Sequence, residues 1–523
     1  MILSKEIHNK IYLIGLFLLA ASMPLSVFMM SVSQIILLLN WILELNFKEK
    51  FKILFSRKSL LIFSSIFLVH IVWLINTTDF QYAYNDLRVK LPILVLPIII
   101  GTSNTLNYKQ IKNIFLAFSA AILLGTLISI YKYMGFGDSA ISDVRQMSSF
   151  ISHIRFSLMI NLAIFALLYY SFKEDKLIFR IILILVSIWF LAFLFILQSF
   201  TGLIIFLVIG FIYAIYTFLK SKNMVLKVSF ITALLLIVIY SAYYVMSIVS
   251  DFYDVEELKF SQLDIKTPNG NYYNHDTLNL SIENGNYIYV YVCHKELEDE
   301  WAKRINVGID RLDAKGQIIR YTLIRYLSSL GLRKDAEGVR QLKNIDVNAV
   351  LNGVTNFKFP KVSIEKKIYE FVWEFDNILK DQNPNGKSTA QRIEYIKAGY
   401  DLVKRNLYFG VGTGDVQTDF NSYYEKSNSK LNQDKWLRAH NQLLTFIITF
   451  GIIGFLIIIF GFIYPIINEK SYKILLFNIF LIISLLSFLN EDTLETQAGI
   501  TFFVFFYTIF VFGFQNPKQL DSI

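Results

Sequence analysis

The sequence predicts an all-α polytopic membrane protein with about twelve transmembrane helices and a large mixed α/β external loop before the last three. Hydrophobic residues make up 54% of the 523 residues and charged residues only 17%, which excludes an ordinary soluble globular protein. Apolar blocks long enough to cross about 30 Å of hydrocarbon alternate with short polar connectors up to about residue 248 and again after residue 440. These blocks are the predicted helices.

Prolines set two of the expected helix boundaries. The first apolar run is divided at Met23-Pro24, because proline lacks an amide donor and disfavours helix in the preceding residue. The fourth block is short and contains Pro92 and Pro97, so we expect a helix supported by neighbouring protein, or a broken one. The expected helices span residues 11–23, 25–45, 59–76, 88–101, 111–133, 153–171, 177–197, 201–219, 226–249, 440–466, 473–489 and 497–514.

Lysine and arginine are concentrated in one set of alternate connectors, which is therefore expected to be cytoplasmic. Its basic stretches are 48–58, 109–112, 173–180, 220–227 and 470–473. The opposite connectors carry acidic residues instead: Asp79, Asp86, Asp138, Asp143, Glu491, Asp492 and Glu495. Both termini are thus predicted inside the cell. The net charge of +9 indicates contact with anionic lipid headgroups, and no aromatic-basic patch indicates nucleic acid.

Four segments follow from this arrangement: transmembrane helices in 1–249, an inserted external subdomain in 250–387, a loop segment in 388–439, and the last three helices in 440–523. Within the insertion, strand-like residues 277–281 and 287–292 flank Asn284-Gly285-Asn286, which predicts a hairpin. Helices are expected at 296–304 and 317–330. The basic residues in and after the second helix indicate either a solvated face or a surface for anionic lipid or glycan phosphate.

The loop segment carries two candidate features. A capping-box pattern at 388–391 precedes a helix predicted at 392–406, so Arg392 stands near free backbone amides and suits a phosphate or diphosphate. A structural surface role is the alternative. Glycines follow at positions 410, 412 and 414, after a helix and with no preceding strand, which excludes a dinucleotide-binding fold. Gly412 and Gly414 then form either a turn whose amides face a ligand or a helix cap and loop.

Histidines at two helix starts are candidates for chemistry. His440 lies directly before an apolar run, with Arg438 and Asn441 beside it, and imidazole can accept a proton near neutral pH. A structural histidine at the membrane interface is the alternative. His153 and Arg155 stand at the outer start of the sixth helix, where ionisable groups in a span favour function. A single cysteine, Cys293, excludes an internal disulfide and a cysteine metal cluster.

The order of these features resembles the O-antigen ligase and polymerase superfamily: Arg392, the glycine run 410–414, His440-Asn441, and an apolar span containing Gly451 and Gly454. The predicted topology is similar as well. The stretches 296–301 and 320–338 look like an insertion found in Bacteroidetes members of that superfamily.

The resemblance implies a C-type glycosyltransferase architecture and a multi-pass protein of the bacterial inner membrane whose active site faces the periplasm. It implies transfer of a glycan from an undecaprenyl-diphosphate carrier to a lipid A–core, glycan or protein acceptor, within the lipid bilayer and without metal or other cofactor. By matching position, Arg392 would hold the diphosphate and His440 would assist the acceptor hydroxyl. The candidate substrate-binding residues are Arg155, His153, Gly412, Gly414, Arg438, Asn441 and Glu491.

One position departs from the family pattern. Members often begin the eighth helix with a Ser-Arg pair, whereas this chain has Phe200 after Ser199, and phenylalanine cannot bind a phosphate. Either Arg155, at the outer end of the sixth helix, supplies the missing charge, or the protein handles its donor differently, and the first alternative is preferred. Glu491 and Asp492 are expected either to orient His440 or bind the acceptor, or to cap the last helix.

Other functions remain open at this point. An O-antigen polymerase or a protein O-oligosaccharyltransferase would use the same donor chemistry. A polysaccharide or lipid transporter or flippase would also have many spans, but it predicts ionisable residues at mid-membrane and inverted repeats, and no internal repeat stands out. A purely structural membrane scaffold would leave Arg392 and His440 without a role.

Overall fold

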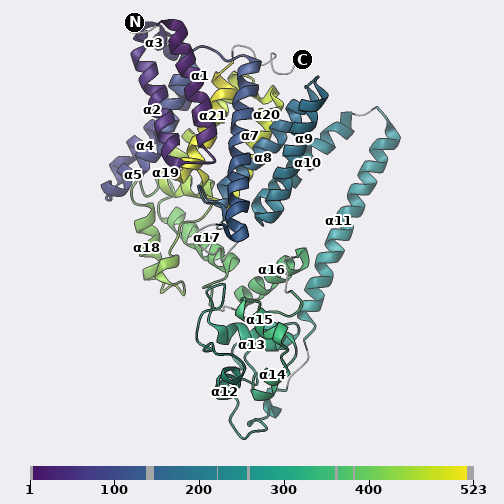
Figure 1. Ribbon diagram of the computed structural model, residues 1–523. Coiled ribbons are helices and arrows are strands. Elements are labelled where there is room, and N and C mark those ends of the chain that lie inside the picture. The colour runs from purple at the N-terminus through teal and green to yellow at the C-terminus, as the bar shows by residue number, and fades with distance from the viewer. Residues whose placement is uncertain are drawn as a thin grey trace. The chain divides into compact units, whose positions relative to one another are not determined.

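The computed structural model describes residues 4–136, 147–220, 222–255, 259–359, 363–380 and 383–514. Asp138 and Asp143 of the predicted external connectors lie outside the described residues. The chain divides into two compact units. The first consists of Met1–Tyr216, Glu394–Ser429 and Trp436–Ile523, and the second of Thr217–Ile393 and Lys430–Lys435. Nearly all regular structure in both units is helical (Figure 1).

Helices lie at every predicted apolar block. The helices of the first unit are α1 (Lys5–Ser22), α2 (Val27–Leu43), α3 (Phe47–Ser56), α4 (Lys58–Val72), α5 (Phe80–Lys90), α6 (Pro92–Thr102), α7 (Tyr108–Tyr131), α8 (His153–Phe172), α9 (Leu177–Ile196), α18 (Val416–Lys426), α19 (Gln442–Asn468), α20 (Leu475–Asn490) and α21 (Gln497–Phe512). Two more helices, α10 (Phe200–Lys220) and α17 (Ser388–Arg405), contribute to both units.

The proline predictions are confirmed. α1 ends at Ser22, just before Met23-Pro24, and α2 begins three residues after that proline. The fourth block is broken: α5 ends at Lys90, and α6 begins at Pro92, where the missing amide is harmless because first-turn amides have no partner within the helix. α3, an amphipathic helix, was not predicted.

Six helices in the described residues are long and apolar enough to cross a membrane, or seven if the bent pair α2 and α3 is one span. They cover Lys58–Asn76, Tyr108–Phe136, His153–Phe172, Leu177–Ile196, Lys227–Tyr253 and Gln442–Asn468. The first and second of these include the short helical turns η1 (Trp73–Asn76) and η2 (Lys132–Phe136). These helices support a multi-pass membrane protein, while the count of about twelve spans stays a prediction.

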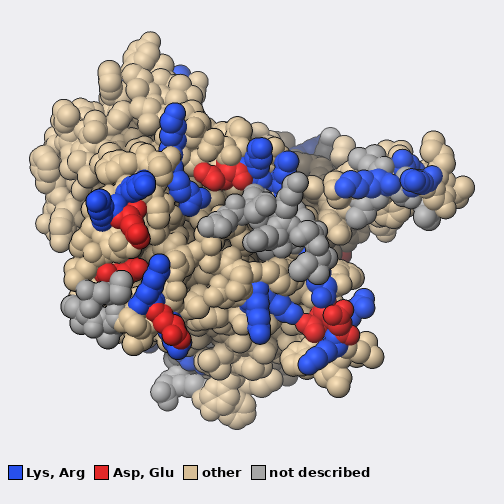
Figure 2. All heavy atoms as spheres, turned by 90° about the horizontal axis from the view of Figure 1, so that it is seen from above, with Lys and Arg blue, Asp and Glu red and all other residues tan. Residues whose placement is uncertain are grey.

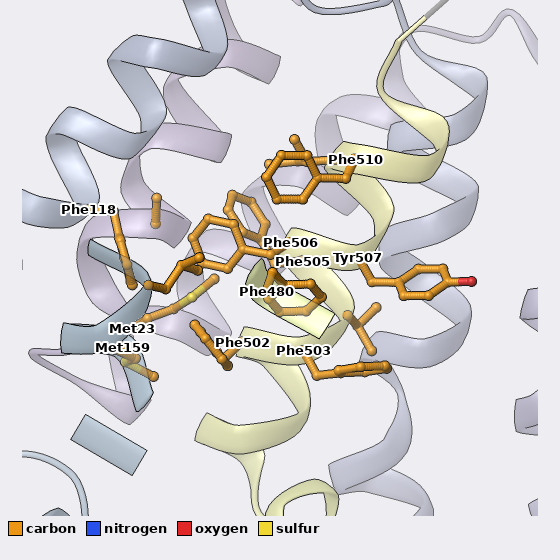
Figure 3. Close-up of a cluster of buried hydrophobic side chains, with 14 of the residues drawn as sticks. Met23, Phe118, Met159, Phe480, Phe502, Phe503, Phe505, Phe506, Tyr507 and Phe510 are labelled. Carbon is orange, nitrogen blue, oxygen red and sulfur yellow. The ribbon is translucent and has the colours of Figure 1, made fainter. Parts of the chain in front are cut away.

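α21 lies at the centre of the first unit, and all but its first residue are buried. Its aromatic rings point to neighbours on several sides (Figure 3). Phe506 contacts Phe118 of α7 edge to face at 5.0 Å, and Phe503 stacks on Phe480 of α20 at 5.8 Å. The hydroxyl of Tyr507 donates to a backbone carbonyl of α19 at 2.6 Å. Since aromatic side chains bury large areas and pair with defined geometry, α21 holds α7, α19 and α20 together.

Connectors predicted on the same side of the membrane lie together. Arg57, before α4, is 3.6 Å from Glu469, after α19, and Lys112 of α7 pairs with Glu174, after α8, at 2.5 Å. Figure 2 shows the face on the side of both chain termini in Figure 1, where more Lys and Arg than Asp and Glu side chains are visible. Acidic residues of the opposite connectors meet at the other ends of the helices and are described below.

The second unit contains a short hairpin among helices. β1 (Ile282–Glu283) pairs antiparallel with β2 (Asn286–Tyr287), and Asn284 and Gly285 between them both have positive φ, 45° and 75°, as a type I′ turn requires. The hairpin therefore has the predicted turn, but its strands are only two residues each and lie directly beside the turn, so the strand predicted at 277–281 was wrong and that at 287–292 keeps only Tyr287. The helices are α11 (Met224–Tyr253), α12 (His294–Arg304), α13 (Ile319–Ser329), α14 (Ala336–Gln341), α15 (Asn344–Leu351) and α16 (Ile364–Leu379).

α19 is interrupted at Gly451, whose φ of 61° and ψ of −174° are not helical. The interruption leaves backbone groups without hydrogen-bond partners inside the helix. Residues 407–412 provide partners for these groups. The amides of Val411 and Gly412 donate to the carbonyls of Ile448 and Thr449 at 2.8 and 3.0 Å, and the amide at position 452 donates to the carbonyl at 407. The glycine loop is thus docked into a broken span, where every backbone polar group needs a partner.

The glycines of this loop are required by close approach. A Cβ on Gly410, which has φ of 67°, would lie 2.4 Å from the carbonyl oxygen of Thr449, and one on Gly414 would lie 2.3 Å from that of Asp79. The amide of Gly412 is used by α19, and the amide of Gly414 donates to the hydroxyl of Thr77 at 3.2 Å. These contacts favour the cap-and-loop alternative over a turn whose amides face a ligand.

Replacing Gly410 by alanine is expected to destabilise the first unit. The positive φ alone costs an L-residue about 1–2 kcal/mol, and the clash with the Thr449 carbonyl adds to it. The melting temperature of the detergent-purified protein should therefore fall by several degrees in Gly410→Ala. Gly210→Ala, in α10, is the control, because no described atom lies within 4 Å of its Cβ position. Equal melting temperatures for Gly410→Ala and the wild type would contradict the docking of the loop.

Candidate functional site

Charged side chains from four separate segments meet at one end of the first unit. They come from α5, from the start of α8, from the stretch just before α19, and from the turn η7 (Thr493–Glu495) with the two residues before it. We call this group the charged cluster, and its members are Asp86, Lys90, Arg155, Arg438, His440, Glu491, Asp492 and Glu495. The connectors involved are the acidic ones that the charge bias places on the external side.

Glu495 is at the centre of the charged cluster. Its carboxylate is 2.9 Å from the ammonium of Lys90 and 3.2 Å from the guanidinium of Arg438, and it accepts a hydrogen bond from the Gln442 amide at 2.9 Å. Lys90 also donates to the carbonyl of Leu494 at 2.7 Å. Buried charges are costly unless they are paired and hydrogen-bonded, so these contacts fix the positions of all three partners.

Asp86 shares Lys90 with Glu495, at 3.6 Å from the ammonium. Burial raises the pKa of Asp86 to about 7, and the negative charge of Glu495 adds to this although Lys90 opposes it. Burial alone would also raise the pKa of Glu495, but the positive charges of Lys90 and Arg438 hold it below its ordinary value. Of the two carboxylates, Glu495 therefore keeps its charge and Asp86 tends to hold a proton.

A small recess of only about 10 Å³ lies beside these residues. Charged groups of the cluster line one part of it, and α4, the glycine loop, the start of α18 and α19 line the rest. Its lining residues are His70, Asp86, Lys90, Thr413, Val416, Arg438, Thr449, Phe450 and Glu495. The hydroxyl of Thr413 donates to the carbonyl of His70 at 2.7 Å, so the loop forms one wall of the recess.

Arg155, in the first turn of α8, points toward the segment before η7. Its guanidinium donates to the Ser152 hydroxyl at 2.9 Å and to the carbonyl of Asp492 at 3.4 Å, while its Nε is buried with no acceptor among the described residues. Asp492, whose backbone carbonyl accepts from Arg155, also has a buried carboxylate. Burial raises the pKa of that carboxylate, which accepts a hydrogen bond from the Thr445 hydroxyl at 2.7 Å. Arg155 therefore has one buried N–H without an acceptor among the described residues.

His440 is held at the entrance of α19. Its Nδ1 is 3.8 Å from a carboxylate oxygen of Glu491, and its ring centroid is 5.5 Å from that of Tyr395 on α17. The next residue, Asn441, caps α19 by accepting from the Leu444 amide at 2.9 Å. His440 itself has φ of 49°, a left-handed conformation that is unfavourable for a non-glycine residue and often marks functional sites.

The candidate residues from the sequence divide into two groups. Arg155, Arg438 and His440 all adjoin the short segment 491–495, which includes Glu491. Asn441 is next to His440, and His153 is two residues before Arg155 on α8. Glu491 and Asp492 do not cap the last helix, since that cap is the Thr496 hydroxyl.

Three candidates lie elsewhere. Gly412 and Gly414 are buried in the docked loop described above. Arg392 is half-buried early in α17 and belongs to the second unit, so its part in the site stays a prediction.

Sequence reasoning missed several members of the charged cluster. Asp86 and Glu495 were noted only as external acidic residues, and Lys90 was not singled out. The signal for Lys90 was its position, four residues after Asp86, near the start of an expected span that follows an acidic connector. No sequence pattern pointed to Gln442 or Tyr395, because their contacts join segments far apart in the chain.

Comparison with known proteins identifies one family. Residues 346–459 match the family model described as O-Antigen ligase. The match includes α17, the glycine loop, His440 and the first two-thirds of α19. This match supports the predicted resemblance to the O-antigen ligase superfamily over residues 346–459, while the Bacteroidetes-type insertion stays a prediction. No curated protein matches the chain.

The raised pKa of Asp86 predicts that stability falls as pH rises from about 5.5 to about 8. The folded protein retains this proton at a higher pH than the unfolded chain, so the contribution is present at low pH and is lost as pH rises through about 7. Glu495 acts with the opposite sign, but only in the acid range below its ordinary pKa. Melting temperatures at both pH values test this.

Asp86→Asn should flatten the pH dependence, because an amide does not titrate. Asp175→Asn, in the connector between α8 and α9, is the matched control and should keep the wild-type profile. A wild-type melting temperature that rises between these pH values would contradict the assignment of the proton to Asp86.

Proposed function

We propose, from the O-antigen ligase domain at residues 346–459, that this chain transfers a glycan from an undecaprenyl-diphosphate carrier to an acceptor hydroxyl. The reaction would take place at the periplasmic face of the bacterial inner membrane and would need no metal or other cofactor. The observation that carries the proposal is the position of His440 and three cations around one short acidic segment, 491–495, at the start of an apolar helix.

The cations suit the donor's leaving group. When the bond between the anomeric carbon and the diphosphate oxygen breaks, negative charge grows on the diphosphate, and fixed cations lower the barrier by stabilising it. Arg155 has an Nε without an acceptor among the described residues and offers the clearest free donor. Protonation of Asp86, whose pKa burial raises to about 7, leaves fewer negative charges to repel the carrier.

His440 suits the acceptor. Its Nδ1 faces Glu491, which orients the ring and leaves Nε2 to take the proton of an acceptor hydroxyl. The acceptor oxygen then forms a bond to the anomeric carbon as the diphosphate leaves. Direct displacement of this kind inverts the anomeric centre, so the product should have the opposite anomeric configuration to the donor.

Arg392 and the segment boundaries remain part of the proposal. By its matching position in the superfamily pattern, Arg392 would be a second diphosphate ligand. The catalytic machinery would combine the loop segment 388–439 with the helices in 1–249 and 440–523, while 250–387 is an accessory insertion. Phe200 is exposed at the start of α10 and offers no charge, so Arg155 would take the place of the arginine that family members often have there.

The acceptor class is left to experiment. Lipid A–core, a growing glycan and a protein hydroxyl all fit the same chemistry, so an O-antigen polymerase and a protein O-oligosaccharyltransferase are the nearest alternatives. A polysaccharide or lipid transporter is less favoured, because the charged cluster lies at helix ends and not along the middle of the spans.

His440→Ala should lower the rate of glycan transfer by about 10²–10⁴-fold, the usual contribution of a general base. Arg392→Ala should lower it by about 10²-fold or more if it stabilises the leaving group. Arg405→Ala is the matched control on α17, since Arg405 is exposed and pairs with Asp401. Transfer would be measured with purified carrier-linked glycan after checking membrane insertion. Near-normal transfer by both His440→Ala and Arg392→Ala would overturn the site assignment.

Deletion in the native host would identify the acceptor. Loss of transfer should cause carrier-linked glycan to accumulate, whichever acceptor is used. Loss of glycan from lipopolysaccharide, capsule or glycoprotein then names the acceptor class. A loss confined to long lipopolysaccharide chains, with single-repeat forms retained, would favour a polymerase. No accumulation of carrier-linked glycan would count against a transferase of this type.

A further inference from the structure

α16 carries an apolar face that no other described part of its own unit covers. Ile364, Phe371, Phe375 and Leu379 are 75%, 57%, 44% and 68% exposed. Spacings of seven, four and four residues put these side chains on one side of a helix, and the rings of Phe371 and Phe375 stack with centroids 6.5 Å apart. A continuous exposed apolar stripe of this kind usually marks a binding surface.

The neighbouring side of α16 is fixed against α11. Tyr369 and Val372 are buried with Ile248 and Phe252, which lie in the last turns of α11. The rings of Phe252 and Tyr369 contact edge to face at 5.3 Å. Figure 1 shows α16 beside this end of α11, in the same unit. The packing leaves the stripe of four apolar residues facing away from the protein core.

α11 indicates where α16 lies relative to the membrane. Its segment Lys227–Tyr253 is apolar and long enough to cross a membrane, and none of its most apolar window is buried by protein. Residues such as Leu236 and Ile239 are more than 60% exposed. Because exposure of apolar side chains to water is unfavourable, we infer that lipid hydrocarbon surrounds them. Tyr243 and Tyr253, in the half of α11 that α16 contacts, are also exposed, and tyrosine is enriched at membrane–water interfaces. That end of α11 therefore lies at a membrane surface.

We propose that α16 lies in the bilayer interface at the end of α11, with its apolar stripe inserted into the leaflet. The partner is the lipid surface itself. Attraction to anionic headgroups contributes little, because the exposed edges of α16 mix lysines with glutamates: Lys367 pairs with Glu370 at 3.1 Å. Burial of the four apolar side chains is the driving force, so neutral phosphatidylcholine should suffice.

The test uses the full-length protein in phosphatidylcholine nanodiscs. An environment-sensitive fluorophore is attached at Phe375→Cys and, in a second variant, at Phe371→Cys. Cys293 is the only native cysteine and is 2% exposed, so the unsubstituted protein serves as the labelling blank. Quenching by lipids with a nitroxide near the headgroup is compared with quenching by aqueous iodide.

Two matched control positions give the quenching expected of a label that faces water. Glu370→Cys lies on the same helix outside the stripe, and Ile345→Cys on α15 is a single apolar residue that is 74% exposed. Labels at 371 and 375 should be quenched by nitroxide lipid at least about two-fold more than the controls, and by iodide less. Iodide quenching equal to that of the controls would overturn the proposal, and so would protection from both quenchers, which would indicate cover by protein. Transfer activity plays no part in this readout.

Discussion

Glu495 is the residue on which the arrangement of the charged cluster depends, because its one carboxylate binds donors from three segments. Lys90 comes from α5, Arg438 from the stretch before α19, and Gln442 from the first turn of α19. Without that carboxylate two largely buried cations would face each other, at a cost of several kcal/mol. The same contacts fix the turn η7 and the residues just before it, to which Arg155 and His440 are directed. The site therefore follows from a charge-pairing requirement.

A second constraint holds the loop that completes the site. The interruption of α19 at Gly451 leaves backbone groups without helical partners, and residues 407–412 satisfy them. The Asp415 carboxylate then accepts from the amides of Thr78 and Asp79, which joins this loop to the start of α5. α5 carries Lys90 and Asp86, so the glycine loop and the charged cluster are one connected structure. Glycines here serve close packing, and the proposed chemistry belongs to the side chains around them.

Much of the fold could be predicted from the sequence, because hydrophobic length and proline position act locally. A break in the block that contains Pro92 was one of two expected outcomes, and the turn at Asn284-Gly285 was predicted. His440 and Glu491 could be named as candidates, but their approach to 3.8 Å could not, since it joins segments about fifty residues apart. Lys90 shows the limit most clearly: its partner Glu495 is 405 positions later, and a single sequence gives no signal for such a pair.

The central claim is that the cations of the charged cluster bind a lipid-linked diphosphate. Equilibrium binding of undecaprenyl diphosphate and undecaprenyl monophosphate to the purified protein in nanodiscs tests it most directly. We expect the diphosphate to bind about ten-fold or more tightly, a difference of about 1.4 kcal/mol or more, and Arg155→Glu to remove the preference. Equal affinity of the wild type for the two lipids, or a preference unchanged in Arg155→Glu, would contradict the account.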